Sequence, residues 1–374
     1  MTNSNVSLDD KYSIESGRIF VTGVQALARI PMVQRQRDVL EGLNTAGFIS
    51  GYRGSPVGGF DQQLWRAKKF LEQNHIRFQP GLNEDLAASA IWGSQQTNLH
   101  EGGKYDGVFA IWYGKGPGVD RCGDVFKHGN MSGPAKHGGV LLIAGDDHAA
   151  KSSTVPHQSE YAFMDASIPV LNPAGVQDIV DYGILGFAMS RFSGCWVAFK
   201  TTAENMDSSA SIDVSPDRVK ISLPKFDMPE GGLSIRWPDD WIEQEHRLHQ
   251  YKLNAVRAFA RQNKIDKTII NSQNPKLGVV TTGKSYLDVR QALEDLGIDE
   301  AKADKIGLRL YKVGMPWPLE QQGIDEFSQG LKEILVIEEK RPIIESQLKE
   351  HLYNHAPENR PNVVGKYDDK GQFL

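Results

Sequence analysis

The chain has 374 residues with 40% hydrophobic side chains and a formal net charge of −5, so it can bury two ordinary cores and should be globular. No window approaches the roughly 18 to 20 apolar residues of a membrane span, and the polar start lacks a secretory segment, so we expect a cytoplasmic protein that contacts no membrane. The net negative charge and the lack of a basic stripe argue against nucleic acid as a binding partner and favour a small substrate.

Short apolar or β-branched runs alternate with helical stretches in the first part of the chain. The strands that they predict are residues 47–52, 107–113, 140–144, 169–171 and 195–202. This alternation is typical of a mostly parallel sheet with helices on its faces. We therefore predict an α/β domain over residues 1–215.

Three of these predicted strands end in glycine and polar residues, at residues 53–56, 114–118 and 145–148. In an open α/β sheet, the loops beyond the carboxyl ends of the strands form the ligand crevice. The sequence thus predicts that the three loops point towards one site. Ordinary turn chemistry is an equally good interpretation of any single loop.

The pattern changes after residue 215. Several prolines and a charged amphipathic stretch at 239–263 predict an interdomain connection over residues 216–275 that includes a helix. A second, smaller α/β domain is predicted over residues 276–356, with strands at 277–282, 307–313 and 333–337 and helices at 286–296 and 343–351. Residues 357–374 have the composition of a tail or linker.

Some strings match ligand motifs only in part. Gly278-Val-Val-Thr-Thr-Gly283-Lys284-Ser285 satisfies the phosphate-loop pattern, but its middle residues are strand formers, so we favour a strand and a turn into a helix. Gly145-Asp146-Asp147 and Asn172 only partly match the G-D-G and Asn pair of a metal and diphosphate site, so we favour a turn or substrate loop. His246 and His249 lie on a charged predicted helix, where a solvated face explains them.

The segment from Pro80 to Trp92 reads as the start of a closely packed helix. Asn83 is in N-cap position, Glu84 and Asp85 fall in the first turn, and small or apolar residues follow. Acids in a first turn are commonly solvent-facing and favourable to the helix dipole. Because Ala, Gly and Ser dominate this helix, we expect tight packing that draws an acid at its start into an interface.

Four strings resemble the alpha-type and fused chains of indolepyruvate ferredoxin oxidoreductase, within the 2-oxoacid:ferredoxin oxidoreductases. They are Gly51-Tyr-Arg-Gly-Ser-Pro-Val-Gly-Gly-Phe-Asp61, Asn83-Glu84, Gly114-Lys-Gly-Pro-Gly-Val-Asp-Arg121 and Gly145-Asp-Asp-His-Ala-Ala-Lys-Ser-Ser153. The resemblance runs through Glu345 and so covers nearly the whole chain. It implies a first domain like the pyrimidine-binding module of thiamine diphosphate enzymes and a second like the C-terminal domain of transketolase.

The resemblance places Glu84 on the family's acid that contacts the aminopyrimidine ring of thiamine diphosphate. A carboxyl bonded to that ring's nitrogen promotes the imino form, which can accept a proton from the thiazolium carbon. Gly54, Ser55 and Pro56 are expected beside the cofactor, with Ser55 as a donor and Arg53 as a partner for the substrate carboxylate. Further candidates for substrate contact, for which a structural role stays open, are Lys115, Arg121, Lys127, His128, Asp147 and His148.

The resemblance also implies a reaction, which is oxidative decarboxylation of a 2-oxoacid such as indolepyruvate to an acyl-coenzyme A, with electrons passed through 4Fe-4S clusters to ferredoxin. This chain has no intact diphosphate motif or metal site, and its two cysteines, Cys122 and Cys195, are too few for a cluster. We expect Mg²⁺ and the clusters on other modules, from a longer protein or a separate chain, in an assembly that is also a homo-oligomer. A non-catalytic scaffold and a nucleotide-dependent enzyme remain alternatives.

Overall fold

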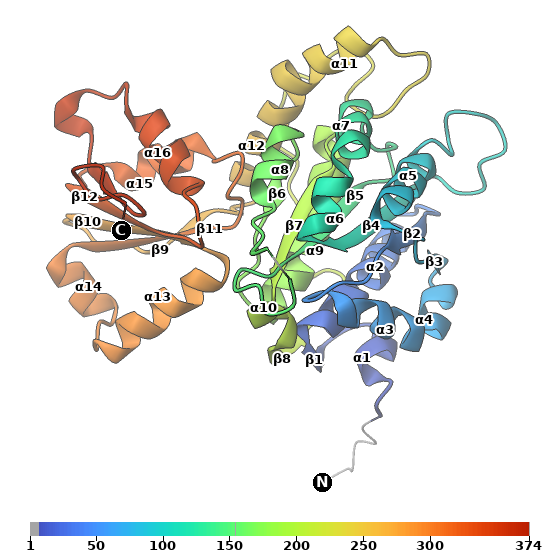
Figure 1. Cartoon of the computed structure of the whole chain (residues 1–374), viewed down its shortest axis with the longest axis horizontal. Coiled ribbons are helices and arrows are strands. Elements are labelled where there is room, and N and C mark those ends of the chain that lie inside the picture. Colours follow the sequence, from blue (N-terminus) through green and yellow to red (C-terminus); the bar gives the residue numbers. More distant parts are fainter. Residues whose placement is uncertain (1–6, 154, 374) are drawn as a thin grey trace.

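The computed structural model describes residues 7–153 and 155–373, which form two α/β units (Figure 1). The larger unit contains a six-stranded sheet in the order β3-β2-β4-β5-β7-β6, and all neighbouring strands are parallel. Its strands are β2 (Ala46–Gly51), β3 (Ile76–Phe78), β4 (Val108–Lys115), β5 (Val140–Asp146), β6 (Val170–Leu171) and β7 (Val197–Thr202). The predicted parallel α/β sheet and its five predicted strands are confirmed.

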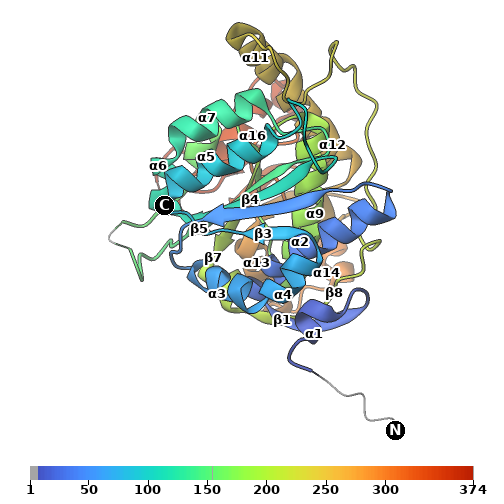
Figure 2. The ribbon, with the colours of Figure 1, turned by 90° about the vertical axis from the view of Figure 1, so that its right-hand side faces the viewer.

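Both faces of this sheet are covered, which explains why its central strands are almost continuously apolar. On β4, Phe109 and Ile111 face one buried cluster, whereas Ala110 and Trp112 face the other. Figure 2 shows α2, α3 and α4 on one side of the sheet and α5, α6 and α7 on the opposite side. Only the ends of the strands are therefore open to a ligand.

The remaining elements of the larger unit follow the alternation of strand and helix. A short antiparallel pair, β1 (Arg18–Thr22) and β8 (Ser209–Asp213), lies beside the main sheet. The helices are α1 (Asp10–Ser13), α2 (Gly23–Leu40), α3 (Gly58–Arg66), α4 (Lys68–Gln73), α5 (Glu84–Gln95), α6 (Gly116–Arg121), α7 (Gly123–Ser132), α8 (Glu160–Asp165), α9 (Val176–Ser193) and α10 (Ala203–Asp207).

The smaller unit has a five-stranded sheet in the order β13-β12-β10-β11-β9, in which only β9 is antiparallel to its neighbour. The strands are β9 (Lys267–Ile270), β10 (Leu277–Thr282), β11 (Leu308–Val313), β12 (Glu333–Ile337) and β13 (Asn362–Val364). Helices α13 (Gly283–Asp295) and α14 (Glu300–Ile306) cover one face, and α15 (Gln321–Ser328) and α16 (Ile344–Leu352) cover the other. The three strands and two helices predicted in this region are confirmed.

Two parts of the predicted division differ from the structure. Strand β9 lies within the predicted connection, yet it pairs with β11. Residues 357–374 were predicted as a linker, but they begin with a short 3-10 helix (Pro357–Asn359) and continue into β13, which pairs in parallel with β12. The buried carboxylate of Glu345 accepts the Lys366 backbone N–H at 2.6 Å, so a polar segment is fixed by contacts that its composition does not show.

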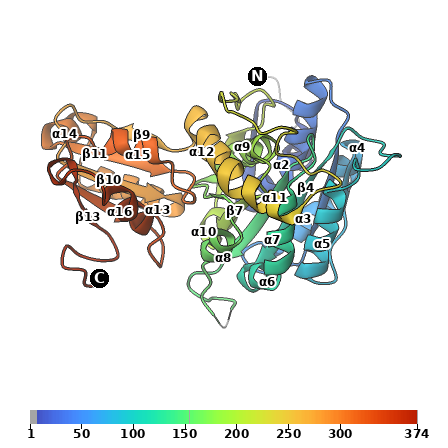
Figure 3. The same cartoon turned by 90° about the horizontal axis from the view of Figure 1, so that it is seen from above.

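The connection between the units contains α11 (Trp241–Arg247), a π-helical turn (Leu248–Lys252) and α12 (Leu253–Gln262), as the charged amphipathic stretch predicts. Helix α12 packs on α9 and lies between the two units in Figure 3. The units also touch directly, because Lys312 of β11 pairs with Asp178 of α9 at 2.5 Å. In residues 7–153 and 155–373, none of the helices has the length and apolar character that crossing a bilayer requires.

We expect Asp38→Asn to lower the free energy of unfolding by about 3 kcal/mol, because it breaks a buried ion pair and leaves a guanidinium unpaired. Asp38 of α2 is fully buried and receives two hydrogen bonds from Arg191 of α9, at 2.6 and 2.8 Å. Urea denaturation measures the effect. The control is Asp217→Asn, which removes an exposed partner of Lys220 and should change stability by less than about 1 kcal/mol. Equal effects of the two substitutions would contradict this assignment.

Candidate functional site

Three loops that leave the carboxyl ends of β2, β4 and β5 meet at one edge of the larger sheet. Gly54 lies so close to Lys115 that a Cβ atom added to Gly54 would stand 2.8 Å from the Lys115 Cβ. Lys115 Nζ donates to the Ser152 backbone oxygen at 2.7 Å and to its Oγ at 2.9 Å. Pro56 lies against Gly145, at 3.0 Å from an added Cβ atom. The structure thus brings the three loops together, as parallel strands predict.

Glu84 is the first residue of α5 and lies at this edge. The Asn83 side chain accepts the Leu86 backbone N–H at 2.8 Å, which confirms the predicted N-cap. Trp112 of β4 donates from Nε1 to the Glu84 backbone oxygen at 3.0 Å and so ties the start of the helix to the sheet. The half-buried Glu84 side chain lies over Gly118, where a Cβ atom would stand 2.5 Å from its Cγ and 2.9 Å from its Oε1. The absence of a side chain at Gly118 therefore leaves the space that the Glu84 carboxyl occupies.

The Glu84 carboxyl makes no hydrogen bond with any residue that the structure describes, so its oxygens can take a ligand. Arg53, Ser55 and Arg121 share this property. All three are exposed, and within residues 7–153 and 155–373 their side chains form no hydrogen bond or ion pair. The edge thus offers a carboxyl, a hydroxyl and two guanidinium groups without protein partners. Such a set can bind a polar ring and a carboxylate.

Lys127 and His128 do not join these loops, although the sequence made them candidates. Both are exposed on α7, where Lys127 pairs with Asp165 at 2.6 Å and His128 stacks on Trp92 with ring centroids 5.8 Å apart. Trp92 lies eight residues beyond Glu84 on α5, which is about 12 Å along the helix axis. Closeness in sequence to the loop after β4 was misleading, because α7 leads away from the sheet edge.

His148 and Asp147 occupy the loop after β5. The carboxylate of Asp147 accepts the backbone N–H groups of Lys151 and Ser152, at 3.0 and 2.8 Å, which confirms a turn here. The His148 Nδ1 atom is 3.0 Å from the His157 backbone oxygen, and its buried Nε2 has no partner among the described residues. Burial, helped by the charge of Lys200, lowers the pKa of His148, so the ring is neutral and can present a free Nε2 lone pair.

A buried ion pair below this loop was missed by the sequence reasoning. Lys200 of β7 and Glu160 of α8 are both buried and form a direct hydrogen-bonded pair. Burial opposes the charge on Lys200, but Glu160 and then Asp146 outweigh it and raise the pKa of Lys200. Asp146 also accepts the Ser159 backbone N–H at 2.8 Å. The available clue was a lysine that directly follows the apolar run Val197-Ala198-Phe199 in β7.

The two partial motifs meet at the contact between the units. Residues 278–282 lie in β10 and α13 begins at Gly283, so a strand followed by a helix is confirmed and the phosphate-loop interpretation is wrong. Asn172 donates from Nδ2 to Thr282 Oγ1 at 3.2 Å. A cavity of about 310 Å³ lies beside this contact, and its lining includes His148, Lys151, Glu204, Lys284 and Lys340. The loop after β5 therefore contributes to the sheet edge and to an interdomain cavity.

Comparison with known proteins gives one family and a set of relatives. Residues 266–373 match the family model described as the indolepyruvate ferredoxin oxidoreductase middle domain. The chain is 27% identical over 346 residues to indolepyruvate oxidoreductase subunit IorA of Pyrococcus abyssi, covering 89% of this chain and 47% of the relative. The same subunit of Methanothermobacter thermautotrophicus is 25% identical over 340 residues, with 89% and 48% covered. The chain thus spans about half the length of the curated relatives it matches.

Solved structures show the same fold. The chain is similar to a 2-oxoglutarate:ferredoxin oxidoreductase from Magnetococcus marinus with 2-oxoglutarate, coenzyme A and succinyl-CoA bound, with a TM-score of 0.64, 15% identity, and 93% of this chain and 62% of that chain covered. It is also similar to a split gene transketolase described as an inactive beta4 tetramer, with a TM-score of 0.52, 11% identity, and 92% and 89% covered. The resemblance stated from the sequence and the fold class are confirmed.

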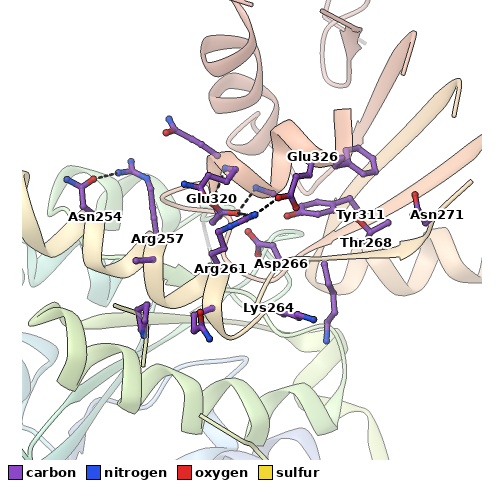
Figure 4. Close-up of a pocket in the computed structure, with 18 of the residues that line it drawn as sticks. Asn254, Arg257, Arg261, Lys264, Asp266, Thr268, Asn271, Tyr311, Glu320 and Glu326 are labelled. Atoms are coloured by element: carbon purple, nitrogen blue, oxygen red, sulfur yellow. Dashed lines mark hydrogen bonds and ion pairs between the residues drawn. The ribbon is translucent and has the colours of Figure 1, made fainter. Parts of the chain in front are cut away.

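A larger cavity of about 1380 Å³ lies away from these loops, between α12, β9, β11 and α15 (Figure 4). Arg261 crosses it to contact Glu320 at 3.4 Å and Glu326 more closely. Asp266 lies below this group in the figure. Its Oδ1 accepts the Gly314 and Met315 backbone N–H groups at 2.7 and 2.9 Å, whereas its buried Oδ2 has no partner among the described residues. No motif in the sequence predicts this cavity, because its lining comes from segments far apart in the chain.

We expect Asp266→Asn to flatten the dependence of stability on pH. Burial raises the pKa of Asp266 from 3.8 to about 7, so the folded chain holds a proton that the unfolded chain loses above pH 4. The free energy of unfolding should therefore fall between about pH 4 and 7, by on the order of 1–4 kcal/mol, and stay reduced above pH 7.

Asparagine retains the Oδ1 acceptor, so the variant should gain stability relative to the natural chain as pH rises. Thermal denaturation at pH 5.5 and pH 8 measures the difference in Tm between the two proteins. Asp217→Asn is the control, because Asp217 is 76% exposed and pairs with the exposed Lys220. Parallel pH profiles of the Asp266→Asn variant and the natural chain would show that Asp266 is not protonated in the folded state.

Proposed function

We propose that this chain, which is similar to subunit IorA, is the front part of a 2-oxoacid:ferredoxin oxidoreductase of the indolepyruvate type. The single observation that carries the proposal is the place of Glu84. Its carboxyl stands at the carboxyl edge of a parallel sheet, is held over Gly118 and has no partner among the described residues. Similarity over 89% of the chain to relatives named indolepyruvate oxidoreductase supports the substrate class.

The residues at the edge fit one half of a thiamine diphosphate site. A carboxyl at this edge can hydrogen-bond a ring nitrogen, which is the group that an aminopyrimidine offers. When bound, thiamine diphosphate supplies the carbon nucleophile for decarboxylation of a 2-oxoacid. The hydrogen bond from Trp112 Nε1 to the Glu84 backbone oxygen holds Glu84 in position relative to the sheet.

The loop after β2 is proposed to orient the substrate. Arg53 is exposed at the same edge as Glu84 and can form a bidentate pair with a carboxylate, which is the group that every 2-oxoacid carries. The Ser55 hydroxyl can donate a hydrogen bond to the cofactor or to the 2-oxo oxygen. Gly54 keeps this loop against Lys115, which is itself held by Ser152.

The rest of the reaction is proposed to need modules outside this chain. Both cysteines are fully buried and far fewer than the thiolates of a 4Fe-4S cluster, so electron transfer to ferredoxin must be supplied elsewhere. We propose the same for the Mg²⁺ and diphosphate half of the cofactor site. Transfer of the acyl group to coenzyme A and assembly as a homo-oligomer belong to this proposal as well.

Glu84→Gln should reduce turnover by at least about 100-fold in the enzyme completed with its remaining modules, because the amide cannot share a proton with the ring. The measurement is reduction of ferredoxin with indolepyruvate and coenzyme A. Asp85→Asn removes the neighbouring charge on the same helix turn and should leave turnover within about threefold, since helix-terminus charges contribute little. Retained turnover in Glu84→Gln would contradict the proposal that Glu84 contacts the aminopyrimidine ring.

A thermal-shift and calorimetry panel separates the proposal from its alternatives. It uses thiamine diphosphate with Mg²⁺, ATP and indolepyruvate as probes. Thiamine diphosphate should bind the completed protein, and ATP should not bind. ATP binding that disappears in Lys284→Ala would count against the proposal and favour a nucleotide-dependent enzyme. Failure of the completed protein to bind thiamine diphosphate would leave a non-catalytic scaffold.

A further inference from the structure

Three potential metal-binding side chains converge on one face of the smaller unit, away from the proposed cofactor site. Asp325 lies on α15, His351 lies in the last turn of α16, and His355 follows the end of that helix. The Asp325 Oδ1 atom is 2.7 Å from His351 Nε2 and 3.5 Å from His355 Nε2. All three potential ligand atoms lie within 4.8 Å of one another.

The His351–Asp325 contact is a hydrogen bond that an ion would replace, and His355 lies at a distance typical of two ligands of one metal ion. Metal bonds of about 2.0–2.2 Å in tetrahedral geometry separate the ligand atoms by roughly 3.3–3.6 Å. His355 Nε2, at 3.5 Å from Asp325 Oδ1, meets this spacing, and His351 Nε2, at 2.7 Å, has to move outward by about 0.6 Å to meet it. A hydrogen-bonded pair needs only one histidine. Here two imidazoles approach the same carboxylate oxygen from residues four apart, with ring centroids separated by 5.3 Å.

The surroundings hold the three side chains in place and keep them accessible. His351, His355 and Asp325 are 16%, 32% and 40% exposed, so an ion can reach them from solvent. The helices that carry His351 and Asp325 are fixed through one apolar core, to which α15 contributes Ile324 and α16 contributes Leu348. The approach of the ligands is thus set by packing on the sheet and does not require the ion to be present.

We propose that Asp325, His351 and His355 form a binding site for a divalent transition-metal ion, with water in the remaining positions. Two imidazole nitrogens and one carboxylate suit Zn²⁺ and its neighbours, whereas Ca²⁺ and Mg²⁺ prefer oxygen ligands alone. The ion ties α15 to the segment that follows α16 and leads into β13. It thereby stabilises the attachment of the C-terminal strand and is independent of the proposed oxidoreductase chemistry.

Titration of the untagged chain with ZnCl₂ at pH 8, followed by calorimetry, tests the proposal. We expect one ion per chain and a higher Tm in the presence of Zn²⁺, because an ion that binds the folded state stabilises it. Substitution of Zn²⁺ by Co²⁺ should give the visible absorption bands of a tetrahedral centre. His351→Gln should weaken Zn²⁺ binding at least tenfold and remove those bands.

Asp325→Asn provides a second variant of nearly unchanged shape and should weaken binding at least tenfold as well. The matched control is His246→Gln with His249→Gln, which removes two exposed histidines of the connecting helix and should leave both affinity and stoichiometry unchanged. Circular dichroism confirms that each variant is folded. Absence of Zn²⁺ binding, or equal affinity in the natural chain and in Asp325→Asn, would overturn the proposal.

Discussion

Close approach of backbone segments at the carboxyl edge of the larger sheet is the constraint on which the candidate site depends. Glu84 has its place because residue 118 carries no side chain, and the loop after β2 reaches Lys115 because residue 54 carries none. Parallel strands bring their loops to the same edge, but only such close contacts bring the side chains within reach of one ligand. The chemistry proposed for Glu84 therefore rests on glycine as much as on the acid.

Buried charge connects this edge to the second unit. Lys200 and Glu160 form an ion pair inside the larger unit, and removal of either side chain would leave the other as an unpaired buried charge. Glu160 begins α8, and the next residue, Tyr161, donates to the Pro342 backbone oxygen at 2.8 Å and lies under the Arg341 guanidinium. The pair thus fixes both the floor of the loop after β5 and the contact with the smaller unit.

Two kinds of element could be predicted from the sequence. They are helices with one buried and one exposed face, and strands that consist of a short continuous apolar run. Helix α2 was missed, because it is buried on most sides and so lacks a polar stripe, and it contains Pro31. Glu84 could be identified because the N-cap at Asn83 is a local sequence signal and because Asn83-Glu84 belongs to the strings that resemble the family. Lys127 and His128 were misplaced, and the Asp266 cavity was missed, because their surroundings come from elements far apart in the chain.

Exposure at the sheet edge fits the proposed division of labour between modules. Inside the protein, a charge without a partner is costly, and the described parts of the chain pair the buried Asp38 and Lys200 directly. Arg53 and Ser55, by contrast, are exposed beside a half-buried Glu84 carboxyl. A lone unit keeps such groups hydrated at little cost, and a second module that covers them can bring cofactor and substrate to satisfy them. Under the proposed function, the open half-site is stable alone and becomes a polar, enclosed site only on assembly.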